Sequence, residues 1–152
     1  MSMVDVTSKP ETFREATAKG EIKLKRETIN LIREGKIEKG DPFLTAKIAG
    51  ILAAKKTSSL IPLCHPIPLT NVEVKVYIAN DTTVEVECNV KTKAKTGVEM
   101  EALVATAVAL LTVWDMTKQY EKDSEGQYPY TAIKNIRVTQ KLKENNDERN
   151  RC

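Results

Sequence analysis

The only histidine of the 152-residue chain, His65, lies in the apolar stretch SLIPLCHPIPL, residues 59–69. Three prolines in this stretch restrict the backbone on both sides of the imidazole. Imidazole is the side chain whose ordinary pKa lies nearest neutrality, so His65 fits a general acid–base or a phosphate donor. A packed loop histidine bonded to the backbone is the alternative. Zinc is disfavoured, because Cys64 and His65 are neighbours and no other cysteine–histidine cluster completes four ligands.

A second candidate pair lies in the sequence WDMTK. Asp115 and Lys118 are three residues apart, so on a helix they share a face. Asp115 directly follows 13 uncharged residues, 102–114, and we expect it to be partly buried. A partly buried carboxylate beside a lysine can have its proton affinity tuned for catalysis. A surface ion pair is the alternative.

The stretch KTKAKTGVEME, residues 91–101, combines positive charge with a helix start. Lys91, Lys93 and Lys95 lie on one side of a predicted strand, either as a solvated edge or as a basic ledge for an anion. Thr96 and Glu99 fit a capping box. Glu101 has no such explanation, because it lies next to the apolar helical run.

Lys39 precedes a predicted helix start. Asp41 is a suitable N-cap and Pro42 a suitable first helical residue, so Lys39 and Gly40 lie in the turn before that helix. The turn would direct the ammonium group at a phosphate, and a surface lysine is the alternative.

The distance between two candidates limits how they act together. Glu101 and Asp115 are 14 residues apart in one predicted helix, which is about 21 Å along its axis. They therefore cannot act on one atom from the same helix. Either the ligand is long, or helix ends from two subunits meet.

The elements that must position these residues follow from hydrophobic periodicity. The pattern predicts strands at 21–25, 72–78, 84–90 and 136–142, and helices at 26–35, 42–56 and 96–120. The 42–56 helix carries an apolar stripe of Leu44, Ile48, Ile51 and Leu52, as expected of a core-facing side. This order predicts an α+β ferredoxin-like sandwich, an antiparallel sheet with helices packed on one face.

The two central strands alternate in polarity and form a predicted hairpin around NDT. Val84, Val86, Cys88 and Val90 share one face, so Cys88 is most simply a core residue. The opposite faces of the two strands are polar, and are either wet or buried against another subunit. Their residues are Glu73, Lys75, Tyr77, Glu85 and Glu87.

Composition indicates one soluble domain over residues 1–152, with a frayed polar tail at 143–152. The net charge of +3 is weak support for nucleic-acid binding. Three cysteines at unrelated spacings predict no disulfide framework. The N-terminus lacks an apolar signal core, and the uncharged apolar run at 102–114, 13 residues long, is too short to span a bilayer. We therefore expect a cytoplasmic protein with no membrane partner.

Five stretches together resemble one known family: MVDVTSK, KGD, AKIAGILAAKKTSSLIPLCHP, KTGVEMEAL and DMTK. At this spacing they resemble the molybdenum cofactor biosynthesis protein C (MoaC) family of cyclic pyranopterin monophosphate synthases, from about Met3 to Lys122. Each motif alone would be weak. The C-terminal YPYTAIKNIRVTQKLK replaces a Lys/Gly-rich run of bacterial members and resembles the archaeal form, so no site lysine is transferred from that run.

The resemblance implies that (8S)-3′,8-cyclo-7,8-dihydroguanosine 5′-triphosphate becomes cyclic pyranopterin monophosphate, with release of diphosphate, in molybdopterin biosynthesis. It implies homohexamers, built as trimers of dimers, with sites shared between subunits. No metal or redox cofactor is implied, although Mg²⁺ could accompany the triphosphate. The implied catalytic residues are Lys39, His65, Asp115 and Lys118, and the implied substrate-binding residues are Leu63, Cys64, His65, Met100, Glu101, Glu99, Arg14 and Lys55.

Two other classes compete with an enzyme. An RNA-binding domain of this topology would need aromatic side chains on its central strands for base stacking, and Tyr77 is the only ring there. We therefore expect no nucleic-acid partner. A regulatory small-molecule-binding domain would have no reason to gather a histidine, an aspartate and lysines in one cleft.

Overall fold

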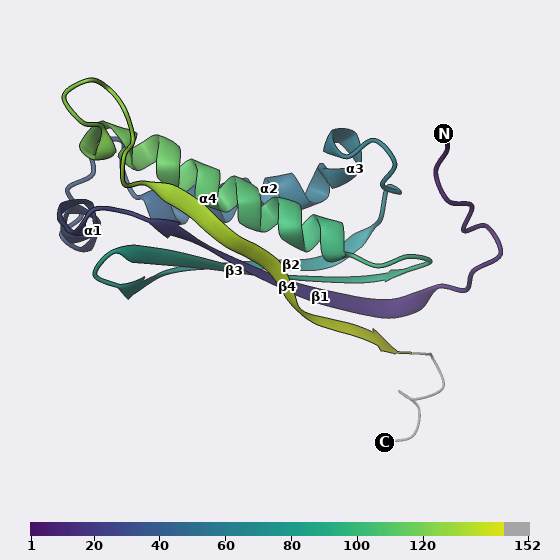
Figure 1. The fold of residues 1–152 in the computed structure, drawn as a ribbon. Helices are drawn as coiled ribbons and strands as arrows, with labels where there is room; N and C mark the ends of the chain where they lie inside the picture. Colours follow the sequence, from purple (N-terminus) through teal and green to yellow (C-terminus); the bar gives the residue numbers. More distant parts are fainter. Residues whose placement is uncertain (145–152) are drawn as a thin grey trace, which may run out of the picture.

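The computed structural model describes residues 1–144, within which four strands and four helices follow one another (Figure 1). They are β1 (Thr12–Lys23), α1 (Arg26–Arg33), α2 (Pro42–Lys55), α3 (Thr57–Leu60), β2 (Leu69–Asn80), β3 (Thr83–Ala94), α4 (Glu99–Glu121) and β4 (Ala132–Glu144).

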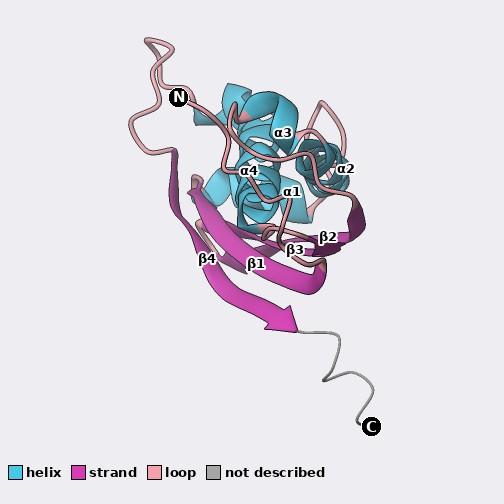
Figure 2. Cartoon of the chain, turned by 90° about the vertical axis from the view of Figure 1, so that its right-hand side faces the viewer, coloured by secondary structure: helices cyan, strands magenta, loops and turns pink. Residues whose placement is uncertain are grey.

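The strands form one sheet in the order β2-β3-β1-β4, and every neighbouring pair is antiparallel. Helices α2 and α4 lie on one face of this sheet (Figure 2). The predicted α+β sandwich is confirmed, and the strand order is that of the ferredoxin-like fold.

Strand β1 is longer than the sequence pattern predicted, because it begins at Thr12 rather than at residue 21. The part of the strand before residue 21 presents the small residues Ala16, Ala18 and Gly20, which give little hydrophobic signal. Small residues are needed here because α4 lies close to the strand. A Cβ built on Gly20 would come within 2.8 Å of Cδ1 of Leu110 in α4.

The predicted hairpin of β2 and β3 is confirmed, with Val72 opposite Val90 and Val76 opposite Val86. The inward face of β3 is fully buried, and Cys88 is 0% exposed within it. Burial raises the pKa of the Cys88 thiol to about 11, so this cysteine behaves as a small core residue.

Helix α2 begins as predicted, but its apolar stripe faces the opposite way. The Asp41 carboxylate caps the helix by accepting from the backbone N–H groups of Phe43 and Leu44. The side that packs into the domain is made of small residues: Ala46, Gly50, Ala53 and Ala54. Three members of the expected core stripe are instead half exposed: Leu44 at 56%, Ile48 at 53% and Leu52 at 50%, while Ile51 is partly buried.

Helix α4 lies across the sheet and beside α2. The predicted capping box is wrong, since the N-cap is Val98 and no side chain caps the first turn. By length and composition α4 could cross a membrane, but half of its apolar stretch is buried inside the domain. It is therefore the core helix of this fold.

Strand β4 runs from Ala132 to Glu144, longer than the predicted 136–142. It includes Lys143 and Glu144, so the predicted frayed tail is wrong for these two residues. The rest of that predicted tail, residues 145–152, lies outside the described residues.

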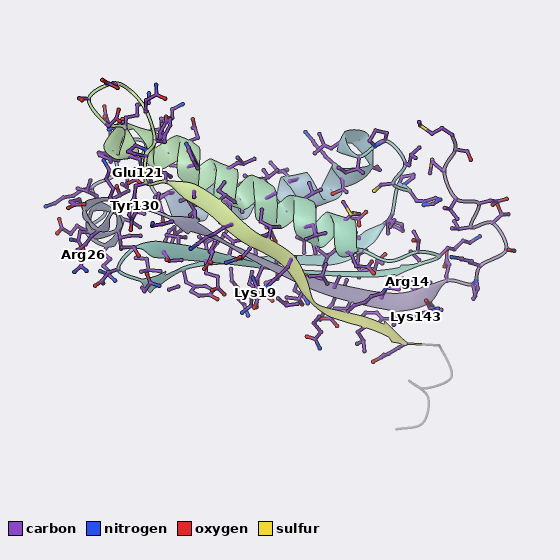
Figure 3. The ribbon with its side chains drawn as sticks, in the orientation of Figure 1. Arg14, Lys19, Arg26, Glu121, Tyr130 and Lys143 are labelled. Carbon is purple, nitrogen blue, oxygen red and sulfur yellow. The ribbon has the colours of Figure 1, made fainter. Side chains whose placement is uncertain are left out.

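The face of the sheet opposite the helices is polar, and no other segment of residues 1–144 covers it (Figure 3). Lys19 of β1 lies 3.3 Å from the Glu85 carboxylate and 3.1 Å from that of Glu87. The Tyr77 hydroxyl donates a hydrogen bond to Glu85. These pairs balance charges of this face within the chain, and whether water or another subunit covers the face stays a prediction.

Candidate active site

Asp115 is the centre of a cluster of three charged residues near the C-terminal end of α4. Its carboxylate lies 2.9 Å from the Lys118 ammonium group, one turn further along the helix, and 3.0 Å from the Lys39 ammonium group. Lys39 also donates to the backbone carbonyl of Asp115, at 3.0 Å. Two lysines from separate segments therefore converge on one carboxylate, an arrangement whose groups can bind a phosphate and accept a proton.

The electrostatics of this cluster differ from the sequence expectation. The Asp115 side chain is 57% exposed in the single chain, so the expectation of partial burial is wrong. Hydrogen bonds from Lys118 and Lys39 hold the pKa of Asp115 below its usual range, and the bond to Asp115 raises the pKa of Lys118. At neutral pH the group therefore combines an ionised carboxylate, which can accept a proton, with a charged lysine.

Lys39 is positioned by neighbours that the sequence did not reveal. Its loop, between α1 and α2, is bound to the end of α4 through Glu38. The backbone N–H of Glu38 donates to the Tyr120 hydroxyl at 2.9 Å, and Gln119 donates to the Glu38 carboxylate at 2.9 Å. Gly40 has a φ of +111°, which favours glycine directly after Lys39. No sequence motif marks these contacts, because they join positions about 80 residues apart.

A pocket of about 340 Å³ lies near the other end of α4. Its walls come from the loop after α3, from the first residues of α4 and the loop before it, and from the N-terminal segment. Six of the sequence candidates line it: Leu63, Cys64, His65, Glu99, Met100 and Glu101. The fold thus brings these residues together, and their role in binding substrate stays a prediction.

His65 makes a hydrogen bond to the backbone, as expected of a packed loop histidine, the alternative to a catalytic role. Its Nε2 atom lies 2.7 Å from the carbonyl oxygen of Val4. Because a carbonyl oxygen only accepts, Nε2 carries the hydrogen in this arrangement. The bond orients the ring at the pocket wall.

Two other pocket residues have perturbed proton affinities. Glu101 is only 4% exposed, and burial, with the nearby charge of Glu99, raises its pKa. Burial and the Glu101 charge likewise raise the pKa of the Cys64 thiol, which makes Cys64 a weak nucleophile. The pocket therefore offers a carboxyl group that holds its proton more readily than an exposed one.

The remaining polar candidates are outside these two groups. Arg14 of β1 donates to the backbone carbonyls of Ala94 at 3.2 Å and Lys95 at 3.3 Å. Burial opposes ionisation of Glu99, but the hydrogen bond from Lys141, with a smaller contribution from the Arg14 charge, lowers the pKa of Glu99. Lys55 lines a separate depression of about 450 Å³ formed by α2 and β2. Ile67 lies between them, since it lines both this depression and the His65 pocket.

The two groups of candidates lie at opposite ends of the molecule. Glu101 and Asp115 both belong to α4, about 21 Å apart along its axis. Figure 3 shows Arg14 at the end that carries the pocket, and Glu121 at the end that carries α1. One chain therefore does not bring His65 and Asp115 to the same point.

The described part of the chain contains no cluster of side chains suited to bind a metal ion. Across residues 1–144, no three histidine, cysteine, aspartate or glutamate side chains come together in a group that could hold a metal ion.

The fold and these two groups define a class, a ferredoxin-like α+β protein with a pocket at one end of α4 and a separate lysine–carboxylate cluster near the other. Comparison with known proteins narrows this class. The family model described as MoaC family matches residues 3–143. The chain belongs to the MoaC family.

Similarity to curated proteins extends over nearly the whole chain. A probable cyclic pyranopterin monophosphate synthase of Pyrococcus furiosus is 60% identical over 144 residues, covering 95% of the chain and 92% of that protein. One from Sulfolobus acidocaldarius is 57% identical over 141 residues, covering 93% and 98%. Both organisms are archaea, as the C-terminal stretch indicated.

Proposed function

We propose that this chain is a cyclic pyranopterin monophosphate synthase, a diphosphate-releasing phosphorus–oxygen lyase of molybdenum cofactor biosynthesis. Its substrate is (8S)-3′,8-cyclo-7,8-dihydroguanosine 5′-triphosphate. Family membership and relatives of this name at 55–60% identity support the activity. The observation that carries the mechanism is the ionised Asp115 held between two lysines.

The charged cluster has two tasks in this reaction. Formation of a cyclic phosphate needs a substrate hydroxyl to lose its proton while diphosphate leaves. Asp115, deprotonated at neutral pH, accepts a proton, and Lys39 and Lys118 stabilise the negative charge on the phosphate oxygens. The arrangement requires no change of protonation before substrate arrives.

The pocket takes the ring system of the substrate. Its volume of about 340 Å³ lies within the range of small-molecule sites. Leu63 and Met100 form apolar walls of this pocket, and His65 and the buried Glu101 contact polar atoms of the substrate rings. His65 and Glu101 exchange protons with the rings while the rings rearrange.

The complete site is shared between two chains, because His65 and Asp115 lie near opposite ends of one molecule. The pocket of one chain then meets the Lys39–Asp115–Lys118 cluster of its neighbour. The chain offers apolar surface for such an assembly: Leu44, Ile48 and Leu52 of α2, with Leu111 of α4 at 57% exposure, are large apolar side chains on the outer side of the helices.

The proposed assembly is a homohexamer, a trimer of dimers, in the cytoplasm. Free thiols at Cys64 and Cys88 fit a reducing compartment. Light scattering should give six times the chain mass of 17.0 kDa. Charged substitutions such as Ile48→Glu should reduce that mass, and a Glu73→Gln control on the outer sheet face should leave the apolar helix surface intact.

Activity is tested by incubating the purified protein with the cyclised nucleotide and measuring released diphosphate. We expect diphosphate and the cyclic pterin phosphate in equal amounts. The assay is run with and without Mg²⁺, because the triphosphate substrate binds this ion. Unchanged nucleotide under both conditions would contradict the proposed function.

Sharing of the site is tested by mixing two inactive variants, His65→Ala and Asp115→Asn, under conditions that allow subunit exchange. Some mixed interfaces then contain an intact pocket and an intact cluster, so activity should return. Mixing two samples of the same variant is the control. If exchange is demonstrated by mass and activity stays absent, the two residues do not act across an interface.

The role of Lys39 is read from kinetics. If Lys39 only holds the triphosphate, Lys39→Ala should raise KM and leave kcat unchanged. If it stabilises departing diphosphate, kcat should fall. Wild-type values for both constants would return Lys39 to the role of a surface lysine.

A further inference from the structure

The N-terminal segment forms a wall of the pocket although it belongs to no strand or helix. Residues 1–11 precede β1, and the segment lies beside the loop that carries His65 (Figure 1). Val4, Val6 and Lys9 line the pocket together with His65 and Glu101. A short coil in this position can contribute side chains directly to a ligand.

Specific contacts hold this segment in place. Val4 accepts the hydrogen bond from His65, and the carbonyl of Thr7 accepts one from the Lys95 ammonium group at 2.9 Å. The Asp5 carboxylate accepts from the backbone N–H of Thr7 at 2.9 Å, which fixes a turn. The N–H of Lys9 then donates to the carbonyl of Val6 at 3.0 Å. These bonds fix the backbone on which the Lys9 side chain is mounted.

The charge of Lys9 is unmatched in this pocket. Among residues 1–144, Lys9 is the one lysine or arginine on the pocket wall, and its ammonium group makes no ion pair. The nearby Glu99 is already paired with Lys141. Glu101 is buried and holds its proton more readily than an exposed carboxyl group. A positive charge without a partner at the rim of a pocket favours an anionic ligand.

We infer that Lys9 is a further substrate-binding residue, which contacts a phosphate oxygen at the rim of the pocket. The inference rests on the proposed function, whose substrate carries a triphosphate. Lys9 adds a positive charge from the pocket's own chain, whereas Lys39 and Lys118 come from the neighbouring chain. Binding of the phosphates would then involve both sides of the subunit interface.

Kinetics of Lys9→Gln and Lys9→Arg test this role. One lost charge-assisted contact corresponds to roughly a tenfold change in binding, so Lys9→Gln should raise KM about tenfold with kcat within about twofold. Lys9→Arg should restore most of the affinity. Lys47→Gln, which removes an exposed lysine of α2 outside both groups, is the matched control and should behave as wild type.

Inorganic triphosphate provides a readout independent of turnover. Its dissociation constant, measured by calorimetry, should rise about tenfold in Lys9→Gln and stay unchanged in Lys47→Gln. Equal values in the two variants overturn the inference, as does an equal loss in Lys9→Arg and Lys9→Gln, or a fall in kcat with unchanged KM. A wild-type protein that releases no diphosphate contradicts the proposed function instead, and the calorimetry still decides the role of Lys9.

Discussion

Replacement of Glu121 should destabilise the protein more than replacement of any exposed carboxylate. This last residue of α4 is 0% exposed. Its two oxygens accept from the backbone N–H of Lys25 at 3.1 Å each, from the Thr131 hydroxyl at 2.7 Å, and from the Thr28 hydroxyl. The carboxylate therefore joins the start of α1, the end of α4 and the segment before β4 (Figure 3).

The cost of two substitutions at this position follows from these contacts. In Glu121→Ala the Lys25 N–H loses its acceptor and cannot rotate, which costs about 1–3 kcal/mol. Removal of the buried side chain leaves a cavity, for a total of about 4 kcal/mol. In Glu121→Gln the amide oxygen can still accept from Lys25, and the amide nitrogen can donate to a threonine hydroxyl. Only the charge reinforcement is lost, about 1 kcal/mol.

Urea unfolding followed by circular dichroism measures the free energy lost in each variant. In a thermal melt, 4 kcal/mol corresponds to a loss of about 8–16 °C in Tm for a chain of this length. Glu125→Ala, in the exposed loop after α4, is the control and should change stability by less than about 0.5 kcal/mol. Equal stabilities of Glu121→Ala and Glu121→Gln would refute the reasoning, because they would show that the Lys25 N–H needs no acceptor.

Three further outcomes are expected. Asp115→Asn should leave Tm close to the wild-type value, because ion pairs on the surface of a chain contribute little to stability, and lose about 10²- to 10⁴-fold in kcat; near wild-type turnover would exclude Asp115 from proton transfer. Glu101→Gln should raise Tm at neutral pH, because burial raises the folded-state pKa of Glu101 above the ordinary 4.5. The contribution of the Glu101 side chain to stability is complete below pH 4.5, where it is protonated in both states, and is lost as pH rises through the folded-state pKa. That gain should vanish in melts below pH 4.5, and a gain independent of pH would contradict this cause. Gly20→Ala should cost about 1–3 kcal/mol in urea unfolding, because its Cβ would meet Leu110 at 2.8 Å and Ile136 at 2.9 Å; an unchanged midpoint would show that α4 can move away.

Periodicity predicted the elements better than their faces. Strands β2 and β3 alternate between valines and charged residues, and both strands and their buried faces are as expected. In α2 the same reasoning chose the wrong side. A Cβ on Gly50 would lie 3.2 Å from the backbone oxygen of Ala105 in α4, so the helices approach closely enough to exclude large side chains. Close helix packing selects small residues, and hydrophobicity alone does not indicate this.

For the candidate site, sequence identified residue types and helical neighbours but not long-range contacts. Spacing placed Asp115 and Lys118 together on one face. The position of Lys39 beside Asp115 depends on the hydrogen bonds between Glu38 and the end of α4, which no local sequence pattern encodes. The apolar run before Asp115 suggested burial, yet that residue faces outward at the next turn of the helix.

The use of one helix to carry both groups has a consequence for how this family can vary. An insertion of one residue between Glu101 and Asp115 would turn one end by about 100° and move it about 1.5 Å relative to the other. Even seven added residues, which nearly restore the rotation, would lengthen the separation by about 10.5 Å. Across homologues, α4 should therefore accumulate substitutions but no gaps between these two positions, whereas the exposed part of the loop after it, residues 122–127, is free to change in length.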